Sequence, residues 1–117
     1  MPIITKHASM RLLQRCGVQK KTQAKVVRRA WSRGVTHSES SIDSNLKRWI
    51  DGLYLSHRKP NKILLYGNGA YLFKDDILIT VIHIPESLQE CVNRLRKEKE
   101  FELNKQKGEK NVSNYLE

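Results

Sequence analysis

The period of the hydrophobic pattern changes at Lys62, and this change constrains the fold more than any other feature of the chain. Before Lys62 the apolar residues recur at helical spacing, whereas the segment 62–85, KILLYGNGAYLFKDDILITVIHIP, is rich in strand formers and contains two turn signals. Asn68-Gly69 is a strong signal for a two-residue hairpin loop, because both positions of that turn need positive φ, and Asp75-Asp76 is a weaker one. The segment therefore predicts three antiparallel strands.

Two-residue loops determine which residues lie opposite each other. Counting from the loops pairs Tyr66 with Tyr71, Tyr71 with Thr80, and Phe73 with Leu78. We expect helices to pack on the aliphatic face of this sheet, formed by Ile63, Leu65, Ala70, Leu72, Ile77, Ile79 and Val81. The other face has the hydroxyls of Tyr66, Tyr71 and Thr80 in a row, which makes it a candidate substrate platform. A one-residue slip in either turn would scramble this row.

Three helices are predicted before the sheet. Thr5 can cap the first and Gly17 can end it, the second spans about 20–33, and the third spans about 44–55, after a polar loop at 38–44. The residues expected to face inward are Ala8, Met10, Leu12, Leu13 and Cys16 in the first helix, Ala24, Val27, Ala30 and Trp31 in the second, and Leu46, Trp49, Ile50 and Leu53 in the third.

The segment after Pro85 carries a short apolar stripe that can dock one helix, formed by Leu88, Cys91, Val92 and Leu95. A chain of 117 residues can build one modest core. We therefore predict an α+β protein with N-terminal helices packed on one face of a small antiparallel sheet and a C-terminal helix or tail. The predicted division is a globular domain, residues 1–95, and a charged helix or flexible tail, residues 96–117.

The charge of the chain is positive and unevenly distributed. The formal net charge is +10 and the isoelectric point is near 9.9, which favours a polyanionic partner such as nucleic acid or an acidic protein surface. From Lys6 to Arg33 there are nine Lys and Arg and no carboxylate. We expect this basic third of the chain to be the contact surface.

Several classes of protein do not fit the sequence. Cys16 and Cys91 are the only cysteines, too few for a disulfide framework and without the spacing of paired metal ligands. No apolar run approaches the roughly 18 residues of a membrane span, and the N-terminus lacks the hydrophobic stretch of a signal peptide. The expectation is a cytoplasmic protein with reduced thiols, no metal, no cofactor and no membrane partner.

His7, Arg11 and Arg15 follow one another at steps of four, so they form a stripe on the first helix. RNA cleavage without a metal needs an acid/base group and cations around the transition state, and histidine and arginine suit these roles. In that interpretation Arg11 binds a phosphate and Arg15 an adjacent one. The alternative is a solvated face of an amphipathic helix, and the spacing alone leaves both open.

Two further groups can contact a nucleic acid. Lys25, Arg28 and Arg29 face outward on the second helix and can bind phosphates, although simple surface charge would look the same. Tyr66 and Tyr71 can stack on bases or donate hydrogen bonds, but cross-strand packing is the common role of such residues. Thr80 is equally explained as a strand-forming residue with a satisfied hydroxyl.

Two stretches together resemble the BECR superfamily, the endoribonuclease-like toxins and phage proteins that share the barnase, EndoU, colicin and RelE-like fold. They are TKHASMRLLQRCG and YLFKDDILITVIHIP, and the resemblance covers Thr5 to Pro85. It implies N-terminal helices, a curved antiparallel sheet and no metal. It also implies that His7 is the acid/base, Arg11 the phosphate clamp with Arg15 as a further candidate, and Thr80 the polar residue of the last strand.

The chain departs from the BECR pattern in two ways. The insertion with the third helix is longer than in the smallest relatives, and no second acid/base histidine stands in a clear motif position. The first functional hypothesis is a toxin-like or phage-derived, metal-independent endoribonuclease that leaves a cyclic phosphate. The alternative is a non-catalytic, phage-encoded regulator that binds nucleic acid or inhibits a host nucleic-acid enzyme. A third is a partner in a toxin–antitoxin pair with an acidic antitoxin.

Overall fold

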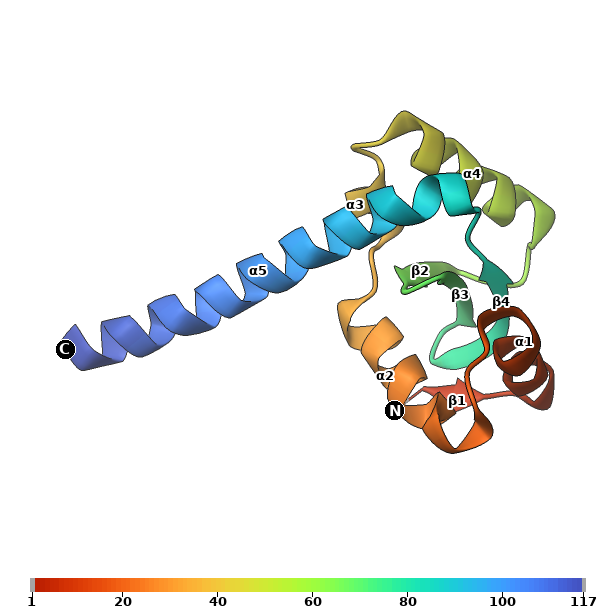
Figure 1. The fold of residues 1–117 in the computed structure, drawn as a ribbon, viewed down its shortest axis with the longest axis horizontal. Helices are drawn as coiled ribbons and strands as arrows, with labels where there is room; N and C mark the ends of the chain where they lie inside the picture. Colours follow the sequence, from red (N-terminus) through yellow and green to blue (C-terminus); the bar gives the residue numbers. More distant parts are fainter. Residues whose placement is uncertain (1, 117) are drawn as a thin grey trace.

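The computed structural model describes the backbone of residues 2–116 and the side chains of residues 2–102. It is an α+β fold with a four-stranded mixed sheet in the order β1-β4-β3-β2 (Figure 1). The elements are β1 (Ile3–Ile4), α1 (Lys6–Cys16), the 3₁₀ turn η1 (Lys20–Thr22), α2 (Gln23–Arg33), α3 (His37–Ser40), α4 (Ser44–Ser56), β2 (Lys62–Tyr66), β3 (Gly69–Lys74), β4 (Ile77–His83) and α5 (Glu86–Leu116).

The predicted helix ends are confirmed in α1. The side chain of Thr5 accepts a hydrogen bond from the backbone N–H of Ala8, and Gly17 ends the helix in the left-handed conformation with φ 67°. The inward face is narrower than predicted: Ala8 and Leu12 are buried, whereas Met10 and Leu13 are about half exposed. α1 packs on a neighbouring strand along only one stripe, so the outer part of the apolar arc remains in water.

The hairpin between β2 and β3 turns one residue earlier than predicted. Its loop is Gly67-Asn68, and Gly67 takes the positive φ of 59°. Tyr66 therefore lies opposite Gly69, and Tyr71 lies opposite Leu64, so the predicted Tyr66–Tyr71 pair is wrong. Gly67 accepts positive φ without the steric cost that a side chain would add, and this freedom places the turn there.

A register shift in β4 separates Thr80 from Tyr71. The Asp75-Asp76 turn and the Phe73–Leu78 pair are confirmed, but Ile79 has no partner on β3 because of an irregularity between Leu72 and Phe73. Beyond it Thr80 lies opposite Leu72, and Val81 lies opposite Tyr71. One extra residue exchanges the faces of everything that follows it, so the predicted row of three hydroxyls does not form.

Helices cover both faces of the sheet, as Figure 1 shows with α3 and α4 above the strands and α1 and α2 below them. α1 and α2 pack on the face that was expected to be an open platform, where Phe73 is fully buried and Tyr71 is 2% exposed. Of the predicted aliphatic face, Ile63, Leu65, Ala70 and Leu72 pack against α4 and α5. Val81 was also assigned to that face, but it lies on the side of α1 and α2. An uncovered face with these aromatic and aliphatic side chains would leave a large apolar area in water, so a second helical layer covers it.

Two short elements were not predicted: β1, at one edge of the sheet, and α3, which overlaps the predicted polar loop at 38–44. β1 adds a two-residue parallel strand beside β4. On the other edge, Val35 exchanges two hydrogen bonds with Leu65, and the Tyr54 hydroxyl accepts one from the backbone of Ile63. These bonds satisfy backbone groups that an edge strand would otherwise leave open.

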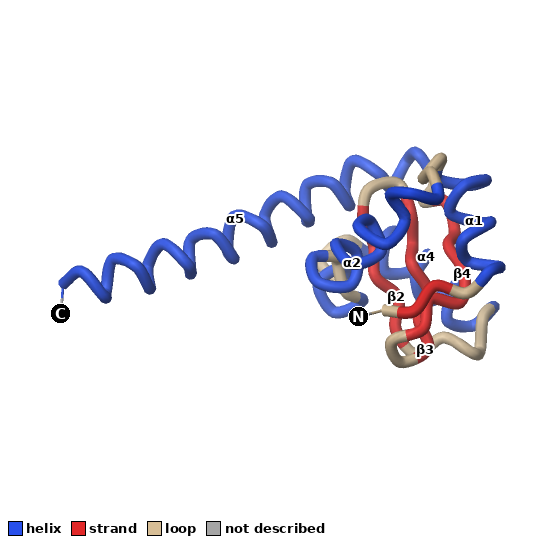
Figure 2. The backbone as a smooth tube through the Cα atoms, turned by 90° about the horizontal axis from the view of Figure 1, so that it is seen from below, coloured by secondary structure: helices blue, strands red, loops and turns tan. Residues whose placement is uncertain are grey.

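α5 crosses the sheet and then extends away from the body of the protein (Figures 1 and 2). Val92 and Leu95 bury its first turns in the core. Further along, the Lys99 ammonium donates to the carbonyl of Gly34 at 2.8 Å and to Glu39 at 2.9 Å. The attachment of α5 thus reaches four residues beyond residue 95. The side chains of residues 103–117, part of the predicted charged tail, lie outside the described residues.

Candidate nucleic-acid interface

The structure brings His7 and Arg11 together on the exposed side of α1. Nε of Arg11 donates to Nε2 of His7 in a long hydrogen bond of 3.5 Å, and Nη1 of Arg11 donates to the Gln14 side chain at 3.3 Å. Both bonds follow from helix geometry, because residues three and four apart lie on one face. Nε2 of His7 can accept this bond only in the tautomer that carries its proton on Nδ1.

Arg15 holds α1 against the sheet. It is half-buried, and its Nη1 donates to the backbone carbonyl of Val81 at 2.9 Å. This carbonyl belongs to the part of β4 beyond its pairing with β1, where the strand has no neighbour on that side. Part of the Arg15 guanidinium, which was predicted to bind a phosphate, is therefore engaged in a hydrogen bond to the protein backbone.

Thr80 and Tyr71 lie away from the His7–Arg11 pair. Thr80 is 7% exposed and shares the face of Leu72, which packs toward α4 and α5, so the sheet separates it from α1. Tyr71 lies beneath α1 and α2, and burial raises the pKa of its hydroxyl. Of the predicted catalytic set, His7 and Arg11 are adjacent and Thr80 is on the opposite side of the sheet.

Gln23 fixes the position of α2 beside α1. This side chain is 4% exposed and makes three hydrogen bonds: the Ser9 hydroxyl donates to it at 2.6 Å, and its amide donates to the carbonyls of Ser9 at 3.0 Å and Val18 at 3.2 Å. Gln23 was not among the residues predicted from the sequence, because one glutamine within a basic segment gives no periodic signal. Together with buried Val27 and Ala30 it fixes the orientation of α2.

The outward side of η1 and α2 carries exposed cations, which we call the cationic surface: Lys20, Lys21, Lys25, Arg28, Arg29 and Arg33. The three ion pairs found within residues 2–102 all involve other residues. No large apolar side chain is exposed on η1 or α2 in the described part of the chain. The predicted contacts Lys25, Arg28 and Arg29 thus lie together in water without a carboxylate partner.

Two aromatic side chains near the ends of β2 carry a cation over the ring. The Arg96 guanidinium lies over half-buried Tyr66, with 5.2 Å between Cζ and the ring centroid. At the other end of the strand, Nζ of Lys62 lies 4.4 Å from the ring centroid of Trp31, which packs edge-on against Phe73. Tyr66, a predicted nucleic-acid contact, is therefore at the border of the core with an arginine on it.

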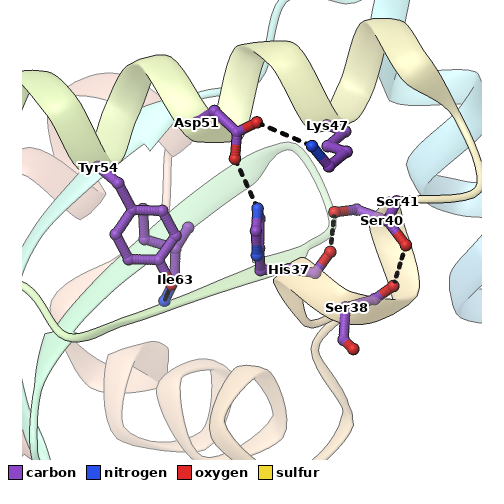
Figure 3. A network of polar contacts seen from close by, with 8 residues as sticks. All are labelled: His37, Ser38, Ser40, Ser41, Lys47, Asp51, Tyr54 and Ile63. Atoms are coloured by element: carbon purple, nitrogen blue, oxygen red, sulfur yellow. Dashed lines mark hydrogen bonds and ion pairs between the residues drawn. The ribbon is translucent and has the colours of Figure 1, made fainter.

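A second polar cluster joins α3 to α4 (Figure 3). Nε2 of His37 lies 2.6 Å from Oδ1 of Asp51, and Lys47 donates to the same carboxylate at 3.3 Å. The bond from His37 lowers the pKa of Asp51. His37 had no predicted role, because its partner is 14 residues away and no local pattern links them.

This cluster lacks the parts of a nucleophilic site. A histidine oriented by an aspartate can activate a hydroxyl that lies within hydrogen-bond reach. Here Ser40 donates to the backbone carbonyl of His37 at 2.7 Å, and Ser41 donates to that of Ser38 at 2.6 Å. The Ser40 and Ser41 hydroxyls are thus engaged with the backbone, and the His37–Asp51 contact fastens α3 to α4.

Other site types have little support in the described part of the chain. Residues 2–102 contain no group of three His, Cys, Asp or Glu side chains placed to hold a metal ion. Burial raises the pKa of the Cys16 and Cys91 thiols, which disfavours the reactive thiolate. Among the described residues, no helix has an apolar stretch that could cross a bilayer.

Comparisons with protein-family models, with curated proteins and with solved structures find no match for this chain. Membership of the BECR superfamily stays a prediction from the two quoted motifs. The geometry offers one exposed histidine–arginine pair on α1 and one continuous set of uncompensated cations on η1 and α2.

Proposed function

We propose that the protein binds nucleic acid, with the cationic surface contacting the phosphate backbone. The observation that supports this proposal is a run of six exposed Lys and Arg on η1 and α2 with no ion pair to a carboxylate in the described chain. When Lys and Arg side chains neutralise phosphates, counterions condensed on the nucleic acid are released, and this release drives association. Lys6 and Arg11 of α1 extend the positive charge on the same side of the sheet.

The chemistry of the surface favours a nucleic acid over an acidic protein. Protein interfaces place large apolar side chains at their centre. The large exposed apolar side chains of the described residues are elsewhere, on α1, α4, α5, β1, β4 and in the loop before α4. A surface made of cations and small or polar residues fits a sugar-phosphate backbone better.

A matched pair of triple variants tests the proposal. Lys25→Gln, Arg28→Gln and Arg29→Gln remove three charges from the cationic surface, and Arg48→Gln, Arg58→Gln and Lys59→Gln remove three exposed charges elsewhere. Binding of a fluorescent single-stranded RNA is measured by anisotropy over a range of salt concentrations. We expect the first triple to reduce the slope of log K against log salt by about 2, and the second to leave it nearly unchanged. Equal effects of the two triples, or no binding by the native protein, would contradict the proposal.

RNA cleavage is a second candidate function, favoured by the contact between His7 and Arg11. When the Arg11 guanidinium turns to a bound phosphate, Nε2 of His7 loses its hydrogen bond and becomes free to accept the proton of a ribose 2′-hydroxyl. The developing charge on the phosphate would then lie beside Arg11. The missing element is a defined general acid for the leaving oxygen. Thr80, the polar residue expected to contact the substrate, is buried beyond the sheet.

Cleavage is tested by incubating labelled RNA with the native protein in EDTA, beside His7→Ala and Gln14→Ala variants. Both substitutions are on the exposed side of α1, so both proteins should fold. Discrete products from the native protein and from Gln14→Ala, but not from His7→Ala, would support cleavage by His7. Intact RNA that is nevertheless bound would exclude cleavage of that substrate and leave the binding function in place.

A further inference from the structure

Arg96 and Tyr66 form a pair across the β2 edge of the sheet. Arg96 comes from α5, and Tyr66 is the last residue of β2. The guanidinium carbon lies over the phenol ring at 5.2 Å from its centroid, and both side chains are half-buried. Part of this pair is therefore open to solvent.

The Arg96 side chain is held by the ring rather than by polar partners. No ion pair within the described residues includes it, although Glu100 lies one helical turn further along α5. Its Nε is buried and has no hydrogen-bond partner. This atom is shielded from solvent, so it is not itself a contact point for a ligand, and the contact with the Tyr66 ring is what holds the guanidinium.

The pair borders the cationic surface. Lys99, one turn beyond Arg96 on α5, donates to the carbonyl of Gly34, which directly follows the last residue of α2. Tyr66 packs against the same core cluster as Val26 of α2. Arg96 is thus close to the end of α2 that carries Arg29 and Arg33.

We propose that Arg96, supported from below by Tyr66, stacks an unpaired nucleobase, so that the protein prefers single-stranded over duplex nucleic acid. This inference rests on the proposed binding function. Guanidinium planes and aromatic rings stack bases that have left a helix, and the contact with the Tyr66 ring restricts the Arg96 side chain before a ligand arrives. The outer N–H groups of Arg96 remain available for the adjacent phosphate. Bases within a duplex are stacked on one another and present no free face.

The test compares a single-stranded RNA with the duplex formed by the same sequence and its complement. Arg96→Lys keeps the charge but loses the planar group, and Tyr66→Leu keeps apolar bulk but removes the ring. Lys97→Ala, an exposed cation at the next position of α5, is the matched control for loss of charge. Anisotropy gives the affinity of each full-length protein for both RNAs, and thermal unfolding shows whether each variant is folded.

We expect Arg96→Lys to weaken single-strand binding roughly five- to tenfold while duplex affinity and the salt slope stay close to native. Tyr66→Leu should shift the single-strand affinity in the same direction. Lys97→Ala should change both RNAs alike. If Tyr66→Leu does not fold, the effect of Arg96→Lys on the two affinities tests the stacking role by itself.

Equal losses on both RNAs, or no loss, in a folded Arg96→Lys protein would overturn the stacking role. In that case a native protein that still binds RNA with a steep salt dependence retains the proposed function, and the pair serves only to attach α5. Absence of binding by the native protein to either RNA would overturn both proposals together.

Discussion

The helices on the two faces of the sheet use charge in opposite ways. Residues 2–34, which form α1, η1 and α2 with β1, contain nine Lys and Arg and no carboxylate, whereas residues 36–56 and 86–102 contain eight carboxylates and six Lys or Arg. All three ion pairs of the described chain lie in the second group, between His37 and Asp51, Lys47 and Asp51, and Lys99 and Glu39. There, His37–Asp51 and Lys99–Glu39 attach one helix to another, and Lys47–Asp51 lies within α4.

Within residues 2–34, most of the hydrogen bonds that attach α1 and α2 come from uncharged side chains. Gln23 links α2 to α1, and the Thr5 hydroxyl donates to the carbonyl of Leu78 at 3.1 Å. Arg15 is the exception, and its partner is an uncharged carbonyl. The layer with the uncompensated cations is therefore held together mainly by neutral hydrogen bonds. Its Lys and Arg side chains remain available to an external polyanion.

The largest effect that can test this comparison is at Gln23. Gln23→Leu removes three hydrogen bonds and leaves the Ser9 hydroxyl and the Ser9 and Val18 carbonyls without their partner. We expect the free energy of unfolding to fall by about 2 kcal/mol, measured by urea denaturation. Gln19→Leu, at an exposed position nearby, is the control and should change it by less than about 0.5 kcal/mol. A Gln23→Leu protein as stable as the control would show that α2 is positioned by apolar packing alone.

A smaller effect of opposite sign is expected on the cationic surface. Lys25 has like charges three and four residues away, at Arg28 and Arg29, and another at Lys21. The triple variant Lys25→Gln, Arg28→Gln, Arg29→Gln should therefore raise the free energy of unfolding in low salt by about 1 kcal/mol, and by less as salt is added. Thermal unfolding at several salt concentrations measures this. A triple variant that is less stable than the native protein at every salt concentration would show that these cations have partners in the folded state.

The smallest effect concerns pH and belongs to the other face of the sheet. The bond from His37 lowers the pKa of Asp51 below its ordinary value of 3.8. The stabilising contribution of this group is therefore complete above pH 3.8 and is lost as the pH falls through the lower pKa of the folded protein.

Denaturation curves of the native protein and Asp51→Asn should differ most near neutral pH and converge in acid. Residues 2–34 carry no carboxylate that could contribute a similar dependence. A stability difference between the two proteins that is constant from pH 7 to about pH 3 would rule out a role for the Asp51 charge.

Local signals in the sequence predicted most helices and turns. Thr5 and Gly17 delimit α1 as expected, Ser44 begins α4, and the Asp75-Asp76 turn sets the Phe73–Leu78 pair. These features depend on neighbours within a few residues, so the pattern contains them. The α+β class followed from the change of period at Lys62.

The wrong predictions concern strand register and burial, which depend on segments that are distant in the sequence. Nothing near Ile79 in the sequence marks it as the residue without a partner, because the irregularity lies in the pairing of β4 with β3, which local patterns do not contain. Tyr71 alternates with aliphatic residues in the same way on an open face as under helices, so only the position of α1 and α2 shows that it is buried. The same limit applies to the candidate site: helical spacing predicted the His7–Arg11 contact, whereas the placement of Arg96 over Tyr66 depends on the path of α5.

The unpartnered Ile79 also determines which mutations β4 can accept. Before it, Leu78 faces α1 and α2; after it, Val81 does so while Thr80 and Ile82 face the other way. A substitution along this strand alters one side chain. Deletion of a single residue at this point would invert the orientation of the following residues and move the carbonyl that Arg15 holds. Descendants of this sequence should therefore vary in the identity of residues 77–83 far more readily than in their number.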